Sequence, residues 1–386
     1  MKKIIIAILT ACLIFSAVAC APANTEPTDP SETKNIPSID LDTPTTSTEE
    51  QATPDVHQLP MISVSVPAVT ESQTTDDGTV LFQYTYQTIS LVLPNPEVAN
   101  KVIIDFLNRI DGTRSDAESV AQLAQNDYNN QSNWIPYLYH ITYNPMRIDP
   151  KVLSLFGNHA SYSGANHPDR SCLSTSYDLL TGDVLTLGSI MNAKATTSDF
   201  CRLVLEGLTE IQQKDYLYDG YEDSVRQRFQ EDENLDQKWY FSQNGLCFYF
   251  EPYEIAPYTS GVITVEIPYE KLKDLLYESY LPEDRDITNG TITIAPFESA
   301  ELSQFSQISE VIQDNEGVMH LIYSENAVQN VRIRVSDAVD TYTIFAAYAL
   351  TPGDAVMVQA DEDVLKTMKI SYESNGETHT QTLISE

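Results

Sequence analysis

The chain has 386 residues, of which 42% are hydrophobic, and it carries a formal net charge of −34. This length suggests two or three domains that can each bury a core, and the apolar fraction excludes a wholly disordered chain. An acidic surface excludes nucleic acid as a partner and favours cationic ones, although the same charge would also keep an exported protein soluble.

The first twenty residues predict a bacterial lipoprotein signal peptide. Two lysines supply a positive end, residues 4–18 are almost all apolar, and Cys20 follows a site of small residues. We therefore expect an exported protein, held by lipid on Cys20 at the extracytoplasmic face of the cell membrane. Residues 9–12 (Leu-Thr-Ala-Cys) also fit the lipobox pattern, so lipidation at Cys12 is an alternative, as are plain secretion and an uncleaved anchor.

Residues 21–58 predict a disordered Thr-, Pro- and Glu-rich arm. They hold eight acids and one lysine, with few large apolar side chains to bury. Such a segment cannot offset the entropy lost on ordering, and as a coil it would hold a domain clear of the lipid headgroups. The signal contributes +2 and the arm −7, so residues 59–386 carry −29 and the acidity is not confined to a tail.

The pattern from residue 59 to 281 predicts interleaved strands and helices. Asn95 is a good N-cap and Pro96 suits the first position of a helix, so a helix is predicted from residue 95. Strands are predicted at 62–66, 80–93, 134–143, 152–161, 171–178, 239–241, 246–250 and 262–267, and further helices at 198–211, 221–229 and 268–280. Because no regular βαβ rhythm appears, we expect the α+β class, as a mixed helix/sheet module with parts at 59–184 and 185–281.

The chain changes character after residues 282–286. Short strands are predicted at 291–294, 318–323, 328–335, 342–350, 355–359, 368–372 and 378–384. Asn375-Gly376 predicts a tight hairpin between the last two. These features predict a small all-β, sandwich-like domain at 290–386.

Three cysteines lie beyond the signal, at Cys172, Cys201 and Cys247. They form an odd set without a CxxC pair, in apolar surroundings. We expect buried free thiols that behave as small hydrophobes; one disulfide with a leftover thiol is the alternative.

The sequence holds no nucleophile elbow, phosphate loop, HExxH or dinucleotide fingerprint. His159 and His167 are the only close pair of histidines, and Asp169 is the nearest third ligand. A hydrogen-bonded turn is the preferred interpretation, with a metal-assisted hydrolase acting on cell-wall glycan as the alternative. We thus expect no cofactor and no metal site; whether the protein is an enzyme is left open at this point, with a non-catalytic role as the preferred interpretation.

Two Tyr-containing segments are unusual. Tyr253 and Tyr258 stand among prolines in a stiff loop between two predicted strands, and a second turn runs from Tyr162 to His167. Rigid Tyr-rich loops suit binding surfaces because they lose little entropy when they bind. We predict that these four residues contact a ligand; a packed connection with internally satisfied hydroxyls is the alternative.

These segments resemble the paired domains of RsiV-type anti-sigma factors and PdaC-type peptidoglycan deacetylases. The family's glycine-alanine-histidine-proline turn is present with one inserted Asn, as residues 164–168. Residues 178–187, the loop at 253–261, the helix from Asn95 and the strand at 152–155 also agree. The resemblance covers roughly residues 61–280, with a PdaC-type part at 59–184 and an RsiV-type part at 185–281.

The resemblance implies an exported α+β module, in a family that includes sensors of lysozyme and modules attached to cell-wall enzymes. No second hydrophobic span, sigma-binding segment or deacetylase domain is evident, and the all-β part lies outside the resemblance. We therefore expect a non-catalytic surface lipoprotein that binds a cell-wall component, such as peptidoglycan, or a cationic wall-acting protein such as lysozyme. A structural spacer is a further alternative.

Overall fold

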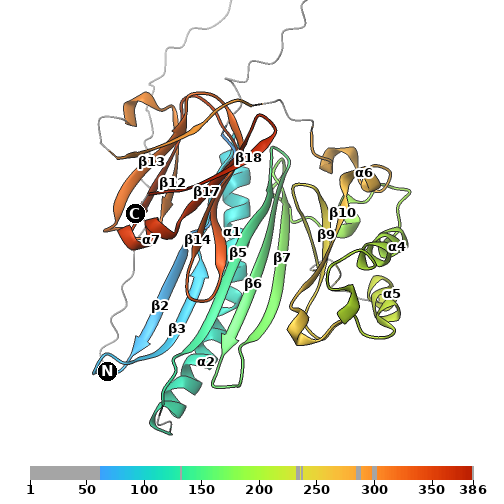
Figure 1. Cartoon of the computed structure of the whole chain (residues 1–386), viewed down its shortest axis with the longest axis horizontal. Coiled ribbons are helices and arrows are strands. Elements are labelled where there is room, and N and C mark those ends of the chain that lie inside the picture. The colour runs from blue at the N-terminus through green and yellow to red at the C-terminus, as the bar shows by residue number, and fades with distance from the viewer. Residues whose placement is uncertain are drawn as a thin grey trace, which may run out of the picture. The chain divides into compact units, whose positions relative to one another are not determined.

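The computed structural model describes residues 61–130, 133–231, 235, 238–283, 288–297 and 302–384. The predicted signal peptide, Cys12, Cys20 and the predicted arm lie outside these residues and stay predictions. Helices and strands occur together with several mixed and antiparallel sheets, which confirms the α+β class (Figure 1). No helix among the described residues is long and apolar enough to cross a membrane.

A five-stranded sheet carries the first part of the chain. Its order is β2-β3-β5-β6-β7, and only β3 and β5 pair in parallel. The strands are β2 (Ala68–Thr74), β3 (Val80–Gln87), β5 (Tyr137–Ile148), β6 (Val152–Tyr162) and β7 (Asp169–Asp178). The parallel pair requires a crossover, and the chain between β3 and β5 supplies it as β4 (Ser90–Val92), α1 (Pro96–Gly112), α2 (Arg114–Asp127) and the single turn η2 (Tyr128–Asn130).

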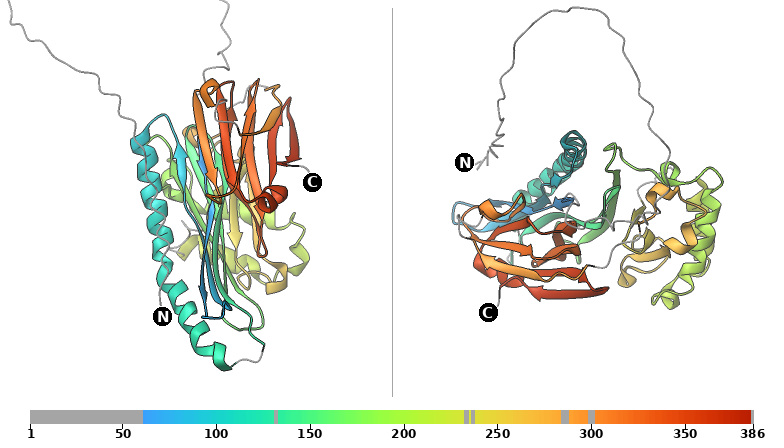
Figure 2. Two further views of the ribbon diagram at one scale, coloured as in Figure 1. Left: turned by 90° about the vertical axis from the view of Figure 1, so that its left-hand side faces the viewer. Right: turned by 90° about the horizontal axis from the view of Figure 1, so that it is seen from above.

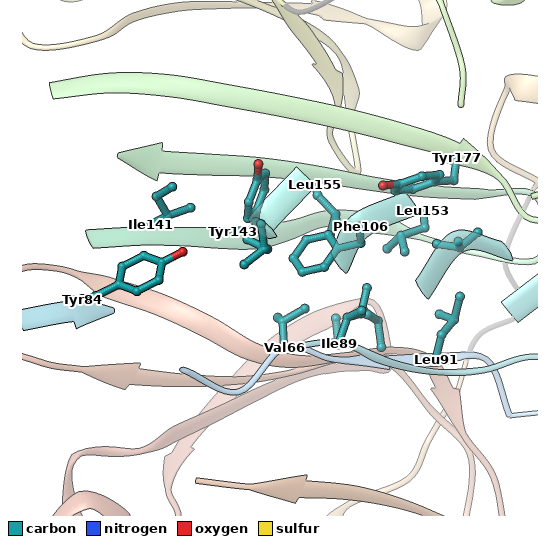
Figure 3. Close-up of a cluster of buried hydrophobic side chains, with 14 of the residues drawn as sticks. Val66, Tyr84, Ile89, Leu91, Phe106, Ile141, Tyr143, Leu153, Leu155 and Tyr177 are labelled. Atoms are coloured by element: carbon teal, nitrogen blue, oxygen red, sulfur yellow. The ribbon is translucent and has the colours of Figure 1, made fainter. Parts of the chain in front are cut away.

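Helix α1 begins as its sequence predicts and buries one stripe against the sheet. The side chain of Asn95 accepts a hydrogen bond from the Glu97 N–H at 3.0 Å, and Pro96 occupies the first turn. Phe106 is fully buried, with its ring edge-on to Tyr143 at 5.2 Å between centroids. Figure 3 shows Phe106 among strand side chains of this core, and Figure 2 shows the helices running along one face of the sheet.

A second, smaller sheet lies next in sequence. It has the antiparallel order β10-β9-β8, and its core packs Phe200 of α4 and Phe229 of α5 against Phe248 of β9. The strands are β8 (Trp239–Phe241), β9 (Gly245–Phe250) and β10 (Ile263–Pro268). The helical elements are α3 (Leu187–Ile190), α4 (Thr197–Leu208), η3 (Lys214–Tyr216), α5 (Tyr221–Glu231), η5 (Tyr258–Ser260), α6 (Tyr269–Leu272) and η6 (Glu278–Tyr280).

The helix predicted at 268–280 is wrong beyond its first turn. α6 ends at Leu272, because the following backbone bonds to another segment instead of continuing the helix. The Asn192 N–H donates to the Leu275 carbonyl, the Tyr277 N–H donates to the Ile190 carbonyl, and Met191 bridges to Leu276. Leu275 and Leu276 pack against the core of the smaller sheet through this pairing with residues 190–192, without being part of a helix.

Two sheets enclose one core in the last part of the chain, as a sandwich does. The four-stranded sheet has the order β11-β13-β16-β12, and the six-stranded sheet β18-β17-β14-β15-β1-β4. Their remaining members are β1 (Ser63–Ser65), β11 (Ile292–Pro296), β12 (Gln307–Ile312), β13 (Val318–Ser324), β14 (Val328–Ser336), β15 (Thr341–Leu350), β16 (Asp354–Ala360), β17 (Lys369–Ser374) and β18 (Glu377–Thr382); η7 (Leu302–Gln304) and α7 (Glu362–Thr367) connect strands.

The six-stranded sheet crosses the boundary predicted at residue 290. β1 pairs antiparallel with β15 and with β4, so two N-terminal strands complete the C-terminal sheet. β15 is buried on both faces: Phe345 enters the sandwich core, whereas Ala346 and Tyr348 enter the core of α1 and the five-stranded sheet. The sequence units predicted on either side of residue 290 therefore share a sheet.

The five-stranded sheet, the smaller sheet and the sandwich meet at a bulge in β5. Between Pro145 and Arg147 the register with β6 shifts by one residue, which leaves Met146 without a partner. The guanidinium of Arg332, on β14, donates to the carbonyl oxygens of Pro145 and, at 2.9 Å, of Met146. The bulge is thereby fixed to the sandwich.

Arg147 fixes the same bulge to the smaller sheet. Its side chain is 2% exposed and pairs with Asp149 at 2.6 Å. It also donates to the Tyr269 hydroxyl at 2.8 Å and to the Tyr280 carbonyl oxygen at 2.7 Å, and it lies over the ring of Phe241. A buried charge with this many partners is costly to disturb, because removing it leaves the carboxylate unpaired.

We predict that Arg147→Met lowers the free energy of unfolding by about 3–5 kcal/mol, since Asp149 then keeps a buried, unpaired charge. The matched control is Arg202→Met, which removes an arginine from a pair with Glu206 that is half exposed on α4. It should cost less than about 0.5 kcal/mol. Urea unfolding followed by circular dichroism measures both. Equal losses in the two variants would contradict the role given to Arg147.

His140, on β5, is a buried imidazole beneath the turn between β14 and β15. It is 3% exposed, its ring lies 6.3 Å from that of Tyr342, and its Nε2 has no hydrogen-bond partner among the described residues. Burial lowers the pKa of His140 below its ordinary 6.5, against the opposing pull of Asp337 and Asp340. Between this lowered pKa and pH 6.5, the imidazole is thus neutral in the folded protein and largely protonated in the unfolded chain.

We predict that His140 makes stability fall in acid. Its contribution is fully present above pH 6.5, the ordinary value, and is lost as the pH falls toward the lower folded pKa. Relative to His140→Gln, the wild-type free energy of unfolding should decline below pH 6.5 by up to about 1.4 kcal/mol per pH unit. Urea unfolding of both proteins between pH 8 and 5 tests this; parallel curves would contradict it.

Candidate functional site

The predicted turn after Tyr162 joins β6 to β7. The hairpin register reaches Ser161 opposite Asp169, so residues 162–168 form its tip. Gly164 has φ +87°, and a Cβ there would lie 2.5 Å from the Tyr137 hydroxyl oxygen. Glycine is therefore required at this position, both for the left-handed backbone and for the close approach of Tyr137.

The second predicted segment is the loop of residues 251–261 between β9 and β10. Tyr253 has φ +73° although it is not glycine, and its side chain remains 62% exposed. A left-handed backbone costs a residue with a Cβ about 1–2 kcal/mol. The Tyr253 N–H donates to the Ala256 carbonyl at 2.9 Å, and Gly261, at φ +68°, ends the loop. The loop thus holds an exposed aromatic side chain in a strained conformation.

Three of the four predicted residues meet in one aromatic stack. The rings of His167 and Tyr258 lie 4.5 Å apart between centroids, and those of Tyr258 and Tyr253 lie 5.7 Å apart. The Tyr258 hydroxyl donates to the Pro168 carbonyl oxygen at 3.1 Å, which joins the loop to the hairpin turn. We call His167, Tyr258 and Tyr253 the aromatic face.

Tyr162 lies in a different cluster. Its half-buried ring packs edge-on against Tyr137 at 5.9 Å, and Tyr137 stacks on Trp134 at 5.0 Å and donates to Asp127 at 2.8 Å. These contacts belong to the core of the five-stranded sheet. Tyr162 therefore supports the turn from the side of α2 and takes no part in the stack.

A network of four charged side chains, here called the charge network, includes the two glutamates that flank Pro252 and Tyr253. Arg228 of α5 pairs with Glu254 at 2.5 Å, and Lys238 pairs with Glu251 at 2.7 Å and approaches Glu254 at 3.8 Å. Arg228 also lies over the ring of Phe250, 4.3 Å from its centroid. Since all four side chains are largely shielded from water, these pairs are stronger than surface ion pairs.

The segment of residues 215–223 also borders the loop, and its role was missed from the sequence. The Tyr218 N–H donates to the Ile255 carbonyl oxygen at 2.9 Å. Tyr216 is 62% and Tyr218 40% exposed, and the acids Asp215 and Asp219 beside them are exposed as well. One sequence signal could have pointed to this segment. It is the run Asp-Tyr-Leu-Tyr-Asp-Gly-Tyr at residues 215–221, in which tyrosines stand next to acids and a glycine.

The ligands considered for a metal do not share a site. His159 is held in the sheet, with Nδ1 2.9 Å from the Ser171 hydroxyl and its ring 4.5 Å from that of Tyr139; burial lowers its pKa. His167 instead stacks on Tyr258. Among the described residues no group of three or more His, Cys, Asp or Glu side chains could hold a metal ion. The hydrolase alternative thus lacks the convergence of His159, His167 and Asp169 that it needs.

The three cysteines are free and buried, which confirms that prediction. Burial raises the pKa of Cys172 and of Cys247 to about 12, and it also raises that of Cys201. Since the thiolate is the reactive form, these thiols are inert at neutral pH.

Comparison with known proteins places one part of the chain. Residues 190–270 match the family model described as a protein of unknown function, DUF3298. No curated protein matches the chain. A solved structure of a DUF3298 family member from Bacteroides fragilis is 16% identical, with a TM-score of 0.42, over 57% of this chain and 95% of that one. One from Pseudomonas aeruginosa is 12% identical, with a TM-score of 0.38, over 60% and 100%.

The matched residues contain the loop of residues 251–261 but not the hairpin turn that carries His167. The match is consistent with the second predicted part, residues 185–281. What the comparisons support is thus a DUF3298-like domain at residues 190–270 of this chain.

Proposed function

We propose that this protein is a non-catalytic binding lipoprotein, anchored through Cys20 at the extracytoplasmic face of the membrane. Its aromatic face would hold a cell-wall component or a cationic protein that acts on the wall. The observation that carries the proposal is Tyr253, an exposed side chain kept on a left-handed backbone. Strain of this kind persists where surrounding structure imposes it, and it gathers at ligand-contacting positions.

Stacked tyrosines are well suited to such a role. They present a large rigid surface with a polar edge and two rotatable bonds each, so that contact costs little conformational entropy. Tyr258 is already fixed by its ring contacts and by the Pro168 carbonyl. A sugar ring or a cationic side chain can lie against the free side of Tyr253, since both are attracted to aromatic faces.

Charge favours the cationic protein of the two candidate ligands. The chain carries −34 in all, and the exposed acids Asp215, Asp219 and Asp223 lie in the segment that borders the loop. Such a surface attracts a cationic protein at long range, in a manner that salt weakens. Binding to a neutral stretch of glycan would not show this salt dependence, which gives a means of telling the two ligands apart.

We predict that Tyr253→Ala and Tyr258→Ala each weaken binding at least about tenfold, because each removes ring surface from the centre of the contact. Lysozyme and purified peptidoglycan are the probes, measured by calorimetry and sedimentation with the full-length chain. The matched control is Tyr277→Ala, which removes another exposed tyrosine, outside the loop.

Raising the salt concentration from about 0.05 to about 0.5 M should weaken lysozyme binding and spare peptidoglycan binding. Retention of neither probe at low salt would overturn the proposed function. Unchanged binding by both tyrosine variants would instead favour the spacer alternative.

We further predict that backbone strain at Tyr253 opposes stability. Tyr253→Gly and Tyr253→Ala lose the same ring, but only glycine adopts φ +73° freely. The glycine variant should therefore have the higher free energy of unfolding, by about 1 kcal/mol, while both variants bind equally weakly. Urea unfolding and the binding assay above check the two parts. Equal stability of both variants would contradict the strain.

A further inference from the structure

The charge network includes both end residues of the turn that contains Tyr253, Glu251 and Glu254. One carboxylate oxygen of Glu254 accepts the Glu251 N–H at 2.6 Å and pairs with Arg228 at 2.5 Å. Its other oxygen lies 3.8 Å from Lys238. The turn of residues 251–254 is itself closed by the backbone, since the Glu254 N–H donates to the Glu251 carbonyl oxygen at 3.1 Å. The Glu254 side chain adds a second bond across the same four residues, directly beside the strained residue.

Glu251 anchors the other end of the same turn. It accepts the backbone N–H of Cys172, on β7, at 2.7 Å and pairs with Lys238 at 2.7 Å. Lys238 precedes β8, and Arg228 belongs to α5. The two glutamates on either side of Pro252 and Tyr253 are therefore tied to three separate elements.

The four side chains are shielded enough for these ties to be strong. Their exposed fractions are 9% for Arg228, 17% for Lys238, 23% for Glu251 and 31% for Glu254. Tyr253, in contrast, is exposed to solvent, and its ring contacts that of Tyr258. Such a side chain cannot itself impose a left-handed backbone. The conformation of Tyr253 must therefore come from the backbone bonds of its turn and from the side chains beside it in the chain.

We propose that Glu254 is a positioning residue for the aromatic face: its carboxylate holds Tyr253 in the exposed, left-handed conformation that a ligand meets. Glu254 itself does not need to touch the ligand. This inference rests on the proposed function where it concerns affinity, whereas its effect on the loop is independent of any ligand.

Hydrogen exchange and limited proteolysis of the full-length chain test the loop without a ligand. In Glu254→Ala the Glu251 amide loses its acceptor, so its exchange should accelerate about tenfold to a hundredfold. Chymotrypsin should then cleave after Tyr253 faster than it does in the wild-type loop. Glu254→Gln keeps an acceptor for the amide but loses the charge, so its exchange should lie between the two.

The matched control is Glu206→Gln, which removes a half-exposed carboxylate from a pair with Arg202 on α4. It should leave exchange and cleavage as in the wild type. Should Glu254→Ala fail to fold, Glu254→Gln supplies the same comparison at smaller amplitude. Wild-type exchange and cleavage in the glutamate variants would overturn the proposal.

Affinity for lysozyme and peptidoglycan separates this inference from the proposed function. Glu254→Ala should weaken binding about tenfold although Tyr253 is intact. If Tyr253→Ala weakens binding while Glu254→Ala loosens the loop without any loss of affinity, the positioning role is wrong and the proposed function stands. If Tyr253→Ala leaves the affinity for both probes unchanged, the proposed function fails, and exchange and cleavage still decide whether Glu254 holds the loop.

Discussion

The bulge at residues 145–147 of β5 is the constraint on which the arrangement of this protein depends. One extra residue, Met146, offsets the strand from β6, and the two arginines that meet there act in different directions. Arg332 brings β14 to the backbone of the bulge, while Arg147 sends its side chain toward Tyr269 and Tyr280. Because both guanidinium groups are directional donors, they fix orientation as well as distance.

The aromatic face depends on this arrangement because it is built from two sheets. His167 comes from the β6–β7 hairpin, whereas Tyr258 and Tyr253 come from the loop after β9. Further bonds hold the two sheets together nearby, such as the Phe241 N–H donating to the Ser154 hydroxyl at 2.9 Å. A stack with centroids 4.5 Å apart tolerates little movement between the sheets, so fixing the sheets also fixes the face.

Local signals in the sequence predicted much of the fold. The Asn-Gly pair at 375–376 has positive φ at both residues, as a tight hairpin requires, and the cap at Asn95 forms as expected. The strand predicted at 62–66 forms as β1, but its partners β15 and β4 could not be predicted. Because β4 pairs with β1, residues 80–93 divide between two sheets where one strand was predicted. Pairing over hundreds of residues leaves no periodic mark on a sequence.

The candidate site likewise has features that local sequence signals predicted and features that depend on the tertiary structure. Residue type and local stiffness pointed to Tyr253 and Tyr258, because prolines and a glycine surround them. Whether His167 or Tyr162 would join them depended on the twist of a hairpin, and the structure brings in only His167. The left-handed backbone of Tyr253 was not predicted either: Tyr253 is the third residue of the turn 251–254, whose charged partners, Arg228 and Lys238, come from earlier in the chain.

Several of the few cationic side chains of this protein are used in internal contacts, which bears on the acidity of its surface. The chain has 22 lysines and arginines against 56 acids, and Arg147, Arg228, Lys238 and Arg332 are engaged in shielded structural contacts. Arg228 and Lys238 neutralise Glu251 and Glu254 on either side of Tyr253, whereas Asp215 and Asp219 stay exposed in the segment that borders the loop. Under the proposed function, rings at the centre would govern how slowly a ligand leaves, and acids at the border would govern how fast a cationic one arrives. The two contributions are therefore separable, because salt acts on the second and leaves the first largely unchanged.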